Sequence, residues 1–337
     1  MTPLQHEITH ICNVFEENGE VMNAGWSRQP VFTYNEPMSK MSGKHGERDC
    51  YFVNNGEVSL YLSVENIGLE FAVKIAVADL KRGGVISDFV VKKINLIKNE
   101  LPTESDKGEF LYSDKRLQLQ LTNTPQGRFL KGDFIDFANI RNLYFNLVLK
   151  KNMGDSLNVL APFERNRKYF YLKRFVPKFV ASGVIRVGGL EYRLSETDGR
   201  AYFDWTRFCK PLHHDYQRLS ADCVIDGRRV SLCLASRVGD NRFGNENCFF
   251  VDGRLHKLDS MAVRGNPARL DRPFFFRSSS EADITFKPFT VGGEAMAAEM
   301  SASTVIFGRL YGEIDSRELS SPLVLDNTQA HLVFSGF

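Results

Sequence analysis

Beyond residue 50, apolar and polar positions alternate with a period of two, which is typical of β-strands with one buried face. Little helical periodicity interrupts these segments. Asp-Gly pairs recur between them, and both residue types tolerate the positive φ that tight hairpin turns need. The pattern therefore predicts an antiparallel all-β protein. The clearest strand segments are residues 57–80, 85–97, 116–123 and 132–151, and the Asp-Gly pairs stand at 198–199, 226–227 and 252–253.

The N-terminal segment carries the one helical pattern. Leu4, Ile8, Ile11 and Phe15 recur at spacings of four, three and four residues. Such spacing places all four on one face of a helix, and Asn18 with the following glycine supplies a stop signal. We therefore expect a short N-terminal helix that packs on the β-protein or covers it as a lid.

The strand pattern breaks over residues 152–168, where Gly154, Pro162 and a charged run separate two strand-rich halves. A chain of 337 residues suits two domains of roughly 100–200 residues each. We expect the domains to be residues 1–160 and 161–337. Each half has the size of an up-and-down barrel, whose closure removes exposed strand edges. The sequence thus predicts two consecutive antiparallel β-barrels, with a pair of β-sandwiches as the alternative.

Composition narrows the class of protein. Hydrophobic residues make up 43% and charged residues 25% of the chain, which is ordinary for a soluble globular protein. No stretch reaches the ~18 apolar residues of a membrane span, and the N-terminus has no secretory pattern. The six cysteines form no CxxC pair, which excludes zinc-ribbon and thioredoxin signatures. We expect a cytoplasmic protein with reduced thiols and no membrane insertion.

Residues 168–179, KYFYLKRFVPKF, alternate positive charges with aromatic and aliphatic side chains. Such a segment suits single-stranded nucleic acid or a protein-interaction surface. The same alternation describes a strand with its apolar residues inside and its Lys and Arg residues outside. Net charge is only +2. We favour the strand interpretation and expect no nucleic-acid partner.

The first candidate site lies in AYFDWTR, residues 201–207. Strand alternation places Tyr202, Asp204 and Thr206 on one face and Trp205 and Arg207 on the other. If Asp204 faced a barrel cavity lined by aromatic rings, burial would raise its pKa and keep it protonated as a general acid. The alternative is a structural carboxylate paired with Arg207 or with a backbone group. Periodicity does not decide which face lines the cavity.

Two adjacent histidines follow this strand. His213 and His214 would point to opposite faces of a regular strand, so they could not both bind one metal ion. With Asp215 and Cys209 nearby, the spacing matches no zinc pattern. We expect these histidines to lie in a loop, and we expect no metal site and no cofactor.

The second candidate site combines Asn245, Glu246 and Asn247 with His256, which lies beyond the Asp-Gly turn at 252–253. Two amides around one acid predict a hydrogen-bonded network that fixes a barrel end or orients a polar ligand group. Glu246 is the second candidate acid. His256 could approach the strand with which it pairs, either as a ligand contact or as a structural histidine.

Several motifs together resemble a bacterial family known only as a domain of unknown function. They read APFERNRKYFYLKRFVPKFVASG, FDWTR, SRVGDNRFGNEN and VDGRLHKL between residues 161 and 258. GWSRQPVFTYN at 25–35, which contains Trp26, and VIFGRLYG at 305–312 are also similar. That family resembles the two-barrel calycin group of AttH-type proteins, carotenoid 1,2-hydratase and lipocalin-like pericyclic cyclases. The resemblance implies tandem lipocalin-like domains that bind an apolar molecule.

The resemblance also implies possible chemistry. In the hydratase relatives a carboxylic acid protonates an alkene, and by analogy Asp204 or Glu246 would do so here. This chain departs from the family pattern after the DWTR motif, where it has Phe208-Cys209-Lys210 and the histidine pair. It also has Asn245 where the family has threonine. If that threonine hydroxyl serves chemistry, this member would bind its ligand without transforming it.

Three functions follow as hypotheses. The first is a binding protein or carrier for a lipid- or isoprenoid-like molecule. The second is a cofactor-independent hydratase, isomerase or cyclase that uses Asp204 or Glu246. The third is an interaction scaffold built on residues 168–179. The sequence leaves enzyme activity and oligomeric state undecided. The candidate ligand-binding residues are Tyr202, Trp205, Arg207, Asn245, Asn247, His256 and Trp26.

Overall fold

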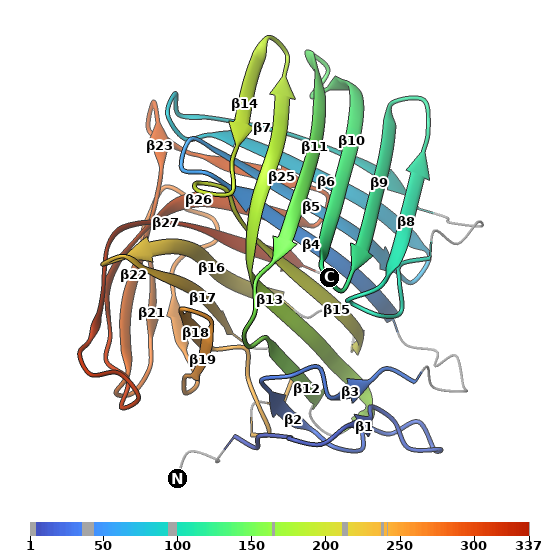
Figure 1. Cartoon of the computed structure of the whole chain (residues 1–337), viewed down its shortest axis with the longest axis vertical. Coiled ribbons are helices and arrows are strands. Elements are labelled where there is room, and N and C mark those ends of the chain that lie inside the picture. The colour runs from blue at the N-terminus through green and yellow to red at the C-terminus, as the bar shows by residue number, and fades with distance from the viewer. Residues whose placement is uncertain are drawn as a thin grey trace. The chain divides into compact units, whose positions relative to one another are not determined.

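The computed structural model describes residues 5–35, 44–93, 100–163, 166–210, 215–236, 239–240 and 242–336. Within these ranges the secondary structure consists of β-strands, and no α-helix is present. The all-β prediction is therefore confirmed. Figure 1 shows the strands along the chain.

The chain folds into two compact units that are interleaved in the sequence. Unit 1 comprises Met1–Lys44, Gly154–Arg174 and Phe208–Phe337, and unit 2 comprises His45–Met153 and Phe175–Arg207. The division expected at residue 160 falls inside the second segment of unit 1. Two long strands contribute to both units, because their residues divide at Arg174 and at Arg207.

The larger sheet contains the strands of unit 2. Its neighbours follow the order β7, β6, β5, β4, β15, β13, β11, β10, β9, β8, while β14 and β12 pair with β13, and β2 pairs with β12. Pairing is antiparallel where the register is assigned. The strands are β2 (Gly25–Ser27), β4 (Lys44–Asn54), β5 (Val58–Ile67), β6 (Glu70–Asp79), β7 (Gly84–Lys92), β8 (Gly108–Ser113), β9 (Leu117–Thr124), β10 (Gly127–Phe137), β11 (Arg141–Lys151), β12 (Leu157–Phe163), β13 (Asn166–Val187), β14 (Leu190–Leu194) and β15 (Arg200–Lys210).

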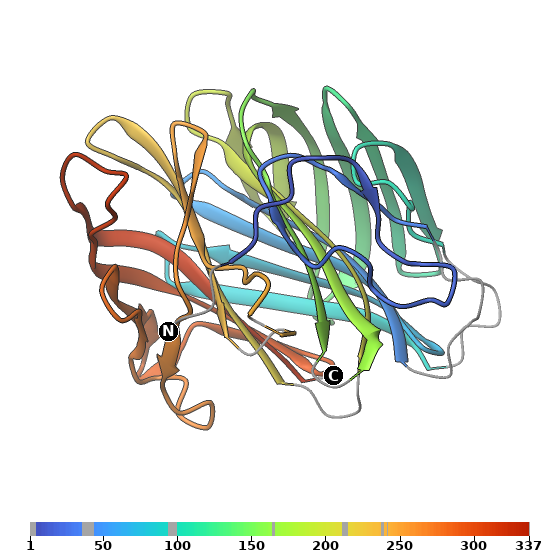
Figure 2. The same ribbon diagram turned by 90° about the horizontal axis from the view of Figure 1, so that it is seen from below.

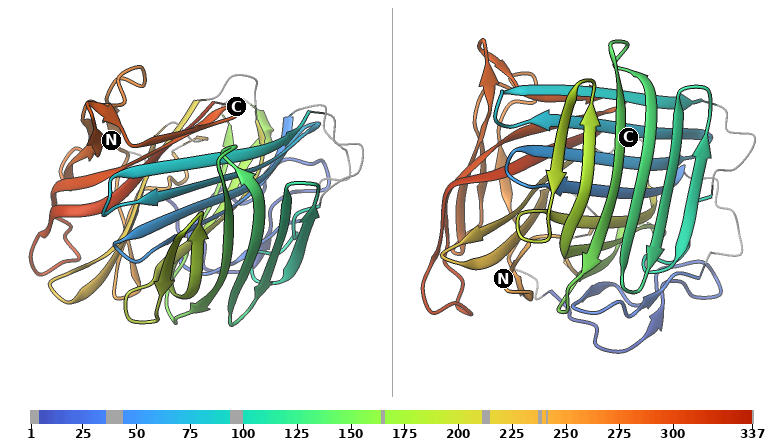
Figure 3. Two further views of the ribbon diagram at one scale, coloured as in Figure 1. Left: turned by 90° about the horizontal axis from the view of Figure 1, so that it is seen from above. Right: turned by 45° about the horizontal axis from the view of Figure 1, so that its top comes forward.

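Within unit 2 this sheet curls into a half-barrel. Phe71 of β6 packs against Phe110 and Tyr112 of β8, with ring centroids 6.2 and 5.1 Å apart, although several strands separate β6 from β8 in the sheet. Tyr51 of β4 likewise donates a hydrogen bond to Asn123 of β9, at 3.0 Å. In Figure 3 the blue and cyan strands β4 to β7 cross the green strands β8 to β11. Strand β9 alternates buried and exposed residues, as a strand with one face toward an interior requires.

The second sheet belongs to unit 1. Its order is β19, β18, β17, β16, β27, β26, β22, β21, β20, and β25 pairs with β26. It also curls, because Phe274 of β21 contacts Phe334 of β27 with ring centroids 5.3 Å apart. The strands are β16 (Asp215–Ile225), β17 (Arg228–Ser236), β18 (Cys248–Val251), β19 (Arg254–Lys257), β20 (Ala262–Arg264), β21 (Phe274–Arg277), β22 (Ala282–Pro288), β25 (Ala297–Met300), β26 (Ser303–Ile314) and β27 (Leu323–Gly336), with β23 (Thr290–Val291) and β24 (Glu294–Ala295) as a separate pair.

The two faces of the unit 1 sheet differ in chemistry. One face carries a continuous apolar core that includes Leu219, Leu232, Phe249, Phe276 and Leu332. The intervening positions on the same strands place polar residues on the opposite face, where they are also buried: Arg218, Ser220, Ser231, Cys233 and His331. Alternation along antiparallel strands produces this separation. The polar face supplies part of the site described below.

The predicted N-terminal helix is wrong. Residues 6–8 run alongside β2 and exchange backbone hydrogen bonds with Trp26, and β1 (Cys12–Asn13) pairs in parallel with β3 (Phe32–Thr33). Figure 2 shows this segment in dark blue. Ile8 and Phe15 are buried, but Ile11 is 80% exposed. The described part of the apolar stripe is therefore not one buried face, and pairing with residues 25–33 overrides the helical spacing.

Candidate functional site

The DWTR motif lies on β15, and its two faces have different surroundings in unit 2. Phe203 stacks on Tyr51 with ring centroids 4.7 Å apart, and Tyr51 bonds to Asn123 across the half-barrel. The face that carries Phe203, Trp205 and Arg207 is therefore the interior face. Tyr202 points the other way, against Phe52 at 5.4 Å and Phe175 at 5.0 Å. The structure thus answers which face of this strand lines the interior.

Arg207 is fully buried and binds several groups. Its Nη1 donates to the Asp49 carboxylate at 2.8 Å, and its Nε lies 3.7 Å from the Glu47 carboxylate. Its guanidinium also stacks on the Trp205 ring, 4.3 Å from the centroid. Burial raises the pKa of Asp49, and the adjacent Arg207 charge offsets part of that effect. The arrangement is a charged pair held beside an indole, inside a mainly apolar half-barrel.

A second buried arginine stands at the start of β10. Arg128 has no solvent exposure, and its guanidinium lies 5.0 Å from the Phe203 ring and 5.5 Å from the Phe179 ring. Its Nη1 donates to the carbonyls of Thr124, at 2.6 Å, and Gly127, at 2.9 Å. Burial lowers the pKa of Arg128, but a guanidinium stays charged in proteins. Among the residues that the structure describes, Arg128 and Arg207 therefore both place a buried guanidinium group on the interior face of unit 2.

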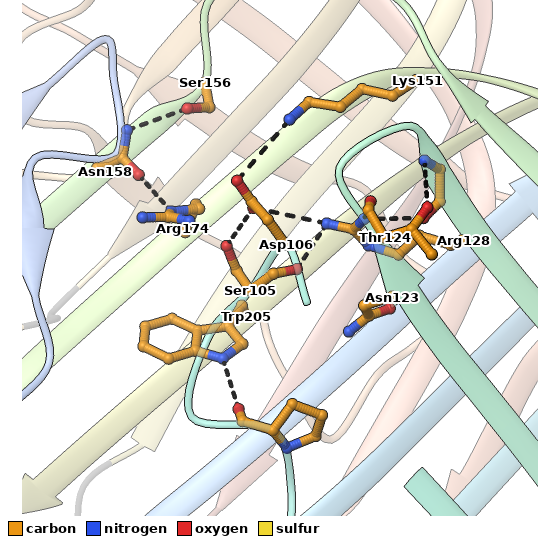
Figure 4. Close-up of polar contacts among 12 residues, drawn as sticks. Ser105, Asp106, Asn123, Thr124, Arg128, Lys151, Ser156, Asn158, Arg174 and Trp205 are labelled. Carbon is orange, nitrogen blue, oxygen red and sulfur yellow. Dashed lines mark hydrogen bonds and ion pairs between the residues drawn. The ribbon is translucent and has the colours of Figure 1, made fainter. Parts of the chain in front are cut away.

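Residues 100–107, here called the strap, directly precede β8 in the chain and contact interior-facing residues of β10 and β15. The Pro102 carbonyl accepts hydrogen bonds from Arg207 Nη2, at 2.6 Å, and from Trp205 Nε1, at 3.3 Å. The Ser105 carbonyl accepts one from Arg128 Nη2, at 2.6 Å. Figure 4 shows these contacts from the strap to Trp205 and Arg128. Three interior donors therefore converge on two carbonyl groups of one short segment.

Asp204 lies on the opposite face of β15 from Trp205 and Arg207. Its side chain is fully buried, and Thr206 donates a hydrogen bond to its carboxylate at 2.9 Å. The carboxylate proposed as an acid thus does not point into the interior that the other two residues line. This orientation follows directly from strand alternation.

Unit 1 holds a separate buried charge cluster, here called the Glu246 cluster: Tyr171, Lys173, Tyr216, Cys233 and Glu246. Lys173 forms an ion pair with Glu246, and neither side chain is more than 1% exposed. Tyr171 donates to Glu246 Oε1 at 2.5 Å, and Tyr216 donates to Oε2 at 3.1 Å. Lys173 also lies 3.3 Å from the Tyr216 hydroxyl and 3.9 Å from Cys233 Sγ.

Electrostatics make Glu246 an ionised carboxylate. Burial alone would raise its pKa, but the charges of Lys173 and Arg218 and the hydrogen bonds from Lys173 and Tyr171 outweigh it and hold the pKa below the ordinary value. Burial also raises the pKa of Cys233, which keeps this neighbour a neutral thiol. A carboxylate in this state accepts hydrogen bonds and does not donate a proton.

The amides beside Glu246 form a hydrogen-bonded network with the backbone. Asn247 accepts a bond from the Ala235 amide at 2.8 Å and donates to the Asp259 carbonyl at 3.2 Å. Lys257 Nζ donates to Asn245 Oδ1 at 3.0 Å and to the Asn245 and Asn247 carbonyls at 2.7 and 2.8 Å. Trp26 lies beside this lysine, with Nζ 5.7 Å from its ring centroid. These contacts fix the loop that presents Glu246.

His256 faces the apolar core of unit 1. It stacks on Phe249 with ring centroids 4.7 Å apart, and its Nδ1 lies 2.9 Å from the Glu318 carboxylate. Burial lowers its pKa, although Glu318 opposes that effect. Since Lys257 follows it directly in the strand, His256 points to the face opposite the one that Lys257 occupies.

Sequence reasoning missed several buried charged residues. Lys173 was expected on the outside of its strand, yet it is fully buried. In unit 2, Lys74 forms a buried ion pair with Glu65 at 2.8 Å, and Glu65 faces Arg48 in register. A single charge inside a long apolar run such as EFAVKIAVAD was the available signal, because a buried charge needs a partner.

Metal binding has no support in the described residues, where no group of three or more His, Cys, Asp or Glu side chains could hold an ion. His213 and His214 lie outside the described residues. Nor does any described helix have the length and apolar character needed to cross a membrane.

Solved structures of other proteins share this architecture. An AttH candidate from Nitrosomonas europaea shares the fold with a TM-score of 0.56 and 8% sequence identity, over 92% of this chain and 99% of that one. Kievitone hydratase from Nectria haematococca shares it with a TM-score of 0.50 and 9% identity, over 97% and 98% of the two chains. No curated protein matches the sequence.

The two curled antiparallel sheets give the chain a lipocalin-like fold of two half-barrels, which it shares with these structural neighbours. A domain of unknown function, DUF2804, matches residues 5–326, and the chain belongs to that family.

Proposed function

We propose that the protein binds an apolar small molecule in the half-barrel of unit 2 and serves as a carrier or sequestering protein. The observation that carries this proposal is the convergence of Trp205, Arg207 and Arg128 on two strap carbonyls within an interior lined by aromatic and aliphatic side chains. Small-molecule sites combine a mostly apolar lining with a few converging polar groups.

The position of the two candidate acids favours binding over acid catalysis. Protonation of an alkene needs a carboxylic acid that holds a proton near the substrate. Glu246 has a pKa below its ordinary value, and Asp204 points away from the unit 2 interior. An interaction surface on residues 168–179 has little support either, since Lys173 and Lys178 of that strand are buried.

The chain contains two tryptophans, Trp26 in unit 1 and Trp205 in unit 2, and this allows a direct test. In Trp26→Phe protein, the emission of Trp205 is measured during titration with 1-decanol, a neutral apolar probe. We expect a saturable change, because the probe would enter the interior that Trp205 lines. Trp205→Phe protein, which keeps Trp26, is the matched control and is expected to show no saturable change.

Trp205 emission also defines the outcome that contradicts binding in unit 2. A Trp205 signal that changes linearly with decanol, or not at all, would contradict binding beside this residue. A saturable change confined to Trp26 would place binding in unit 1 instead.

A further inference from the structure

The strap occupies donors that a ligand could use. Its Pro102 and Ser105 carbonyls hold Arg207 Nη2, Trp205 Nε1 and Arg128 Nη2, which all come from interior-facing positions. Carbonyl groups of the protein thus stand where the oxygen atoms of a bound molecule would meet the same donors. The strap belongs to the described residues of unit 2 and makes these contacts with β10 and β15 of that unit.

The two guanidinium groups differ in how their charge is balanced. Arg207 has Asp49 at 2.8 Å and Glu47 at 3.7 Å, and both carboxylates lie on β4. Arg128 forms its ion pair, at 3.7 Å, with Asp106 of the strap itself. Within the described residues its Nε, which is buried, has no hydrogen-bond partner. Moving the strap would therefore take away the carboxylate with which Arg128 forms its ion pair and leave Asp49, which is already paired with Arg207, as the carboxylate that still interacts with its charge. Such a change is costly for a buried charge unless an anion replaces the lost carboxylate.

We propose that unit 2 binds an amphiphile with an apolar body and a carboxylate head, and that this head replaces the strap carbonyls on Arg128, Arg207 and Trp205. The inference rests on the proposed function and adds the class of ligand. A carboxylate head carries one negative charge and so replaces the one counter-charge that Asp106 supplies to Arg128. A phosphate dianion would carry more negative charge than Asp106 does. The planar guanidinium also matches the two oxygens of a carboxylate. The apolar body lies against the interior rings, among them Phe203 and Phe179, which flank Arg128.

The test compares two ligands that differ only in the head group. Trp26→Phe protein is titrated with decanoate and with 1-decanol at a pH well above the carboxylic acid pKa, and Trp205 emission gives both dissociation constants. We expect decanoate to bind at least about tenfold more tightly, which corresponds to about 1.4 kcal/mol. Arg128→Met is expected to remove this preference, so that the dissociation constants for decanoate and 1-decanol come to within about twofold of each other.

Two further variants complete the design. Arg193→Met removes a charge from an exposed arginine of the same unit, 79% exposed, and is expected to change neither affinity. Arg128→Lys keeps the charge but loses the planar fork, so it is expected to retain part of the preference. Should the methionine variant fail to fold, the lysine variant decides the result.

The outcomes separate the two proposals. Equal affinities for decanoate and decanol in the Trp26→Phe protein, or a preference that survives at full strength in both Arg128 variants, would overturn the carboxylate inference alone. Binding of neither ligand would overturn the proposed function together with it.

Discussion

Lys173 and Glu246 form an ion pair from which solvent is excluded on both sides, with side-chain exposures of 0% and 1%. They lie 73 residues apart in the sequence. Two tyrosine hydroxyl groups complete the coordination of the carboxylate. Removing two charges from water costs several kcal/mol per ion, which mutual attraction and added hydrogen bonds must offset. The pair therefore stabilises unit 1 only as long as both members are present.

Removal of one member of the Lys173–Glu246 ion pair should destabilise the protein far more than removal of both. We expect Lys173→Met to lower the free energy of unfolding by about 3–5 kcal/mol, because it leaves Glu246 buried without its counter-charge. The double variant Lys173→Met/Glu246→Leu should recover part of that loss. Lys150→Met, at an exposed pair with Glu196, is the control and should cost no more than about 1 kcal/mol. Urea unfolding measures all three, and equal losses in the single and double variants would contradict the account.

The free energy of unfolding should begin to fall at a pH above the range in which carboxylates titrate. Burial, with the charge of Arg218, holds the pKa of His331 well below 6.5 in the folded protein. As the pH falls below about 6.5, the unfolded chain binds a proton that the folded protein does not, so stability declines by up to about 1.4 kcal/mol per pH unit. The contribution of the neutral His331 to the free energy of unfolding is thus fully present above that pH and is lost progressively below it.

The measurement is urea unfolding between about pH 7 and pH 5. His331→Asn should flatten the decline, and replacement of the exposed His10 by glutamine should not. An unchanged slope in His331→Asn would show that this histidine titrates normally in the folded state.

The curl of the unit 2 sheet can be tested through Phe71 and Tyr112. Their rings are 5.1 Å apart, although their strands are distant in the sheet order. A double-mutant cycle with Phe71→Leu and Tyr112→Leu should give a coupling energy of about 0.5–1.5 kcal/mol. Phe71→Leu paired with Phe129→Leu, on the exposed face of β10, should be additive within about 0.5 kcal/mol. Additivity in both cycles would be inconsistent with a curled sheet.

The period-two alternation of apolar and polar residues accounts for most of the fold that could be predicted from the sequence. The segments at 57–80, 116–123 and 132–151 all form strands, because alternation reports directly on which residues can share a buried face. The N-terminal helix failed because backbone pairing with residues 25–33 is a long-range event that local spacing does not encode. The interleaving of the two units is equally non-local, since β13 and β15 each contribute residues to both.

The candidate sites also depend on contacts between distant strands, which local sequence patterns do not encode. Alternation correctly set Trp205 and Arg207 apart from Asp204, but only contacts with Tyr51 and Asp49 show which face is interior. Arg128 and Lys173 were missed as interior charges, because Lys and Arg are normally exposed and no local pattern marks an exception. Partners that make their burial tolerable lie on distant strands, such as Glu246 for Lys173.

Photo-crosslinking with a diazirine-bearing decanoate tests the central claim most directly, because it reports where the ligand lies. Peptide mass spectrometry of the labelled protein should find the modification on interior-facing residues of unit 2, such as Leu119 and Leu121 of β9, and excess decanoate should suppress it. The intervening Gln118 and Gln120, which face solvent, serve as internal controls. Labelling of those glutamines, or labelling confined to unit 1, would contradict binding in the unit 2 half-barrel.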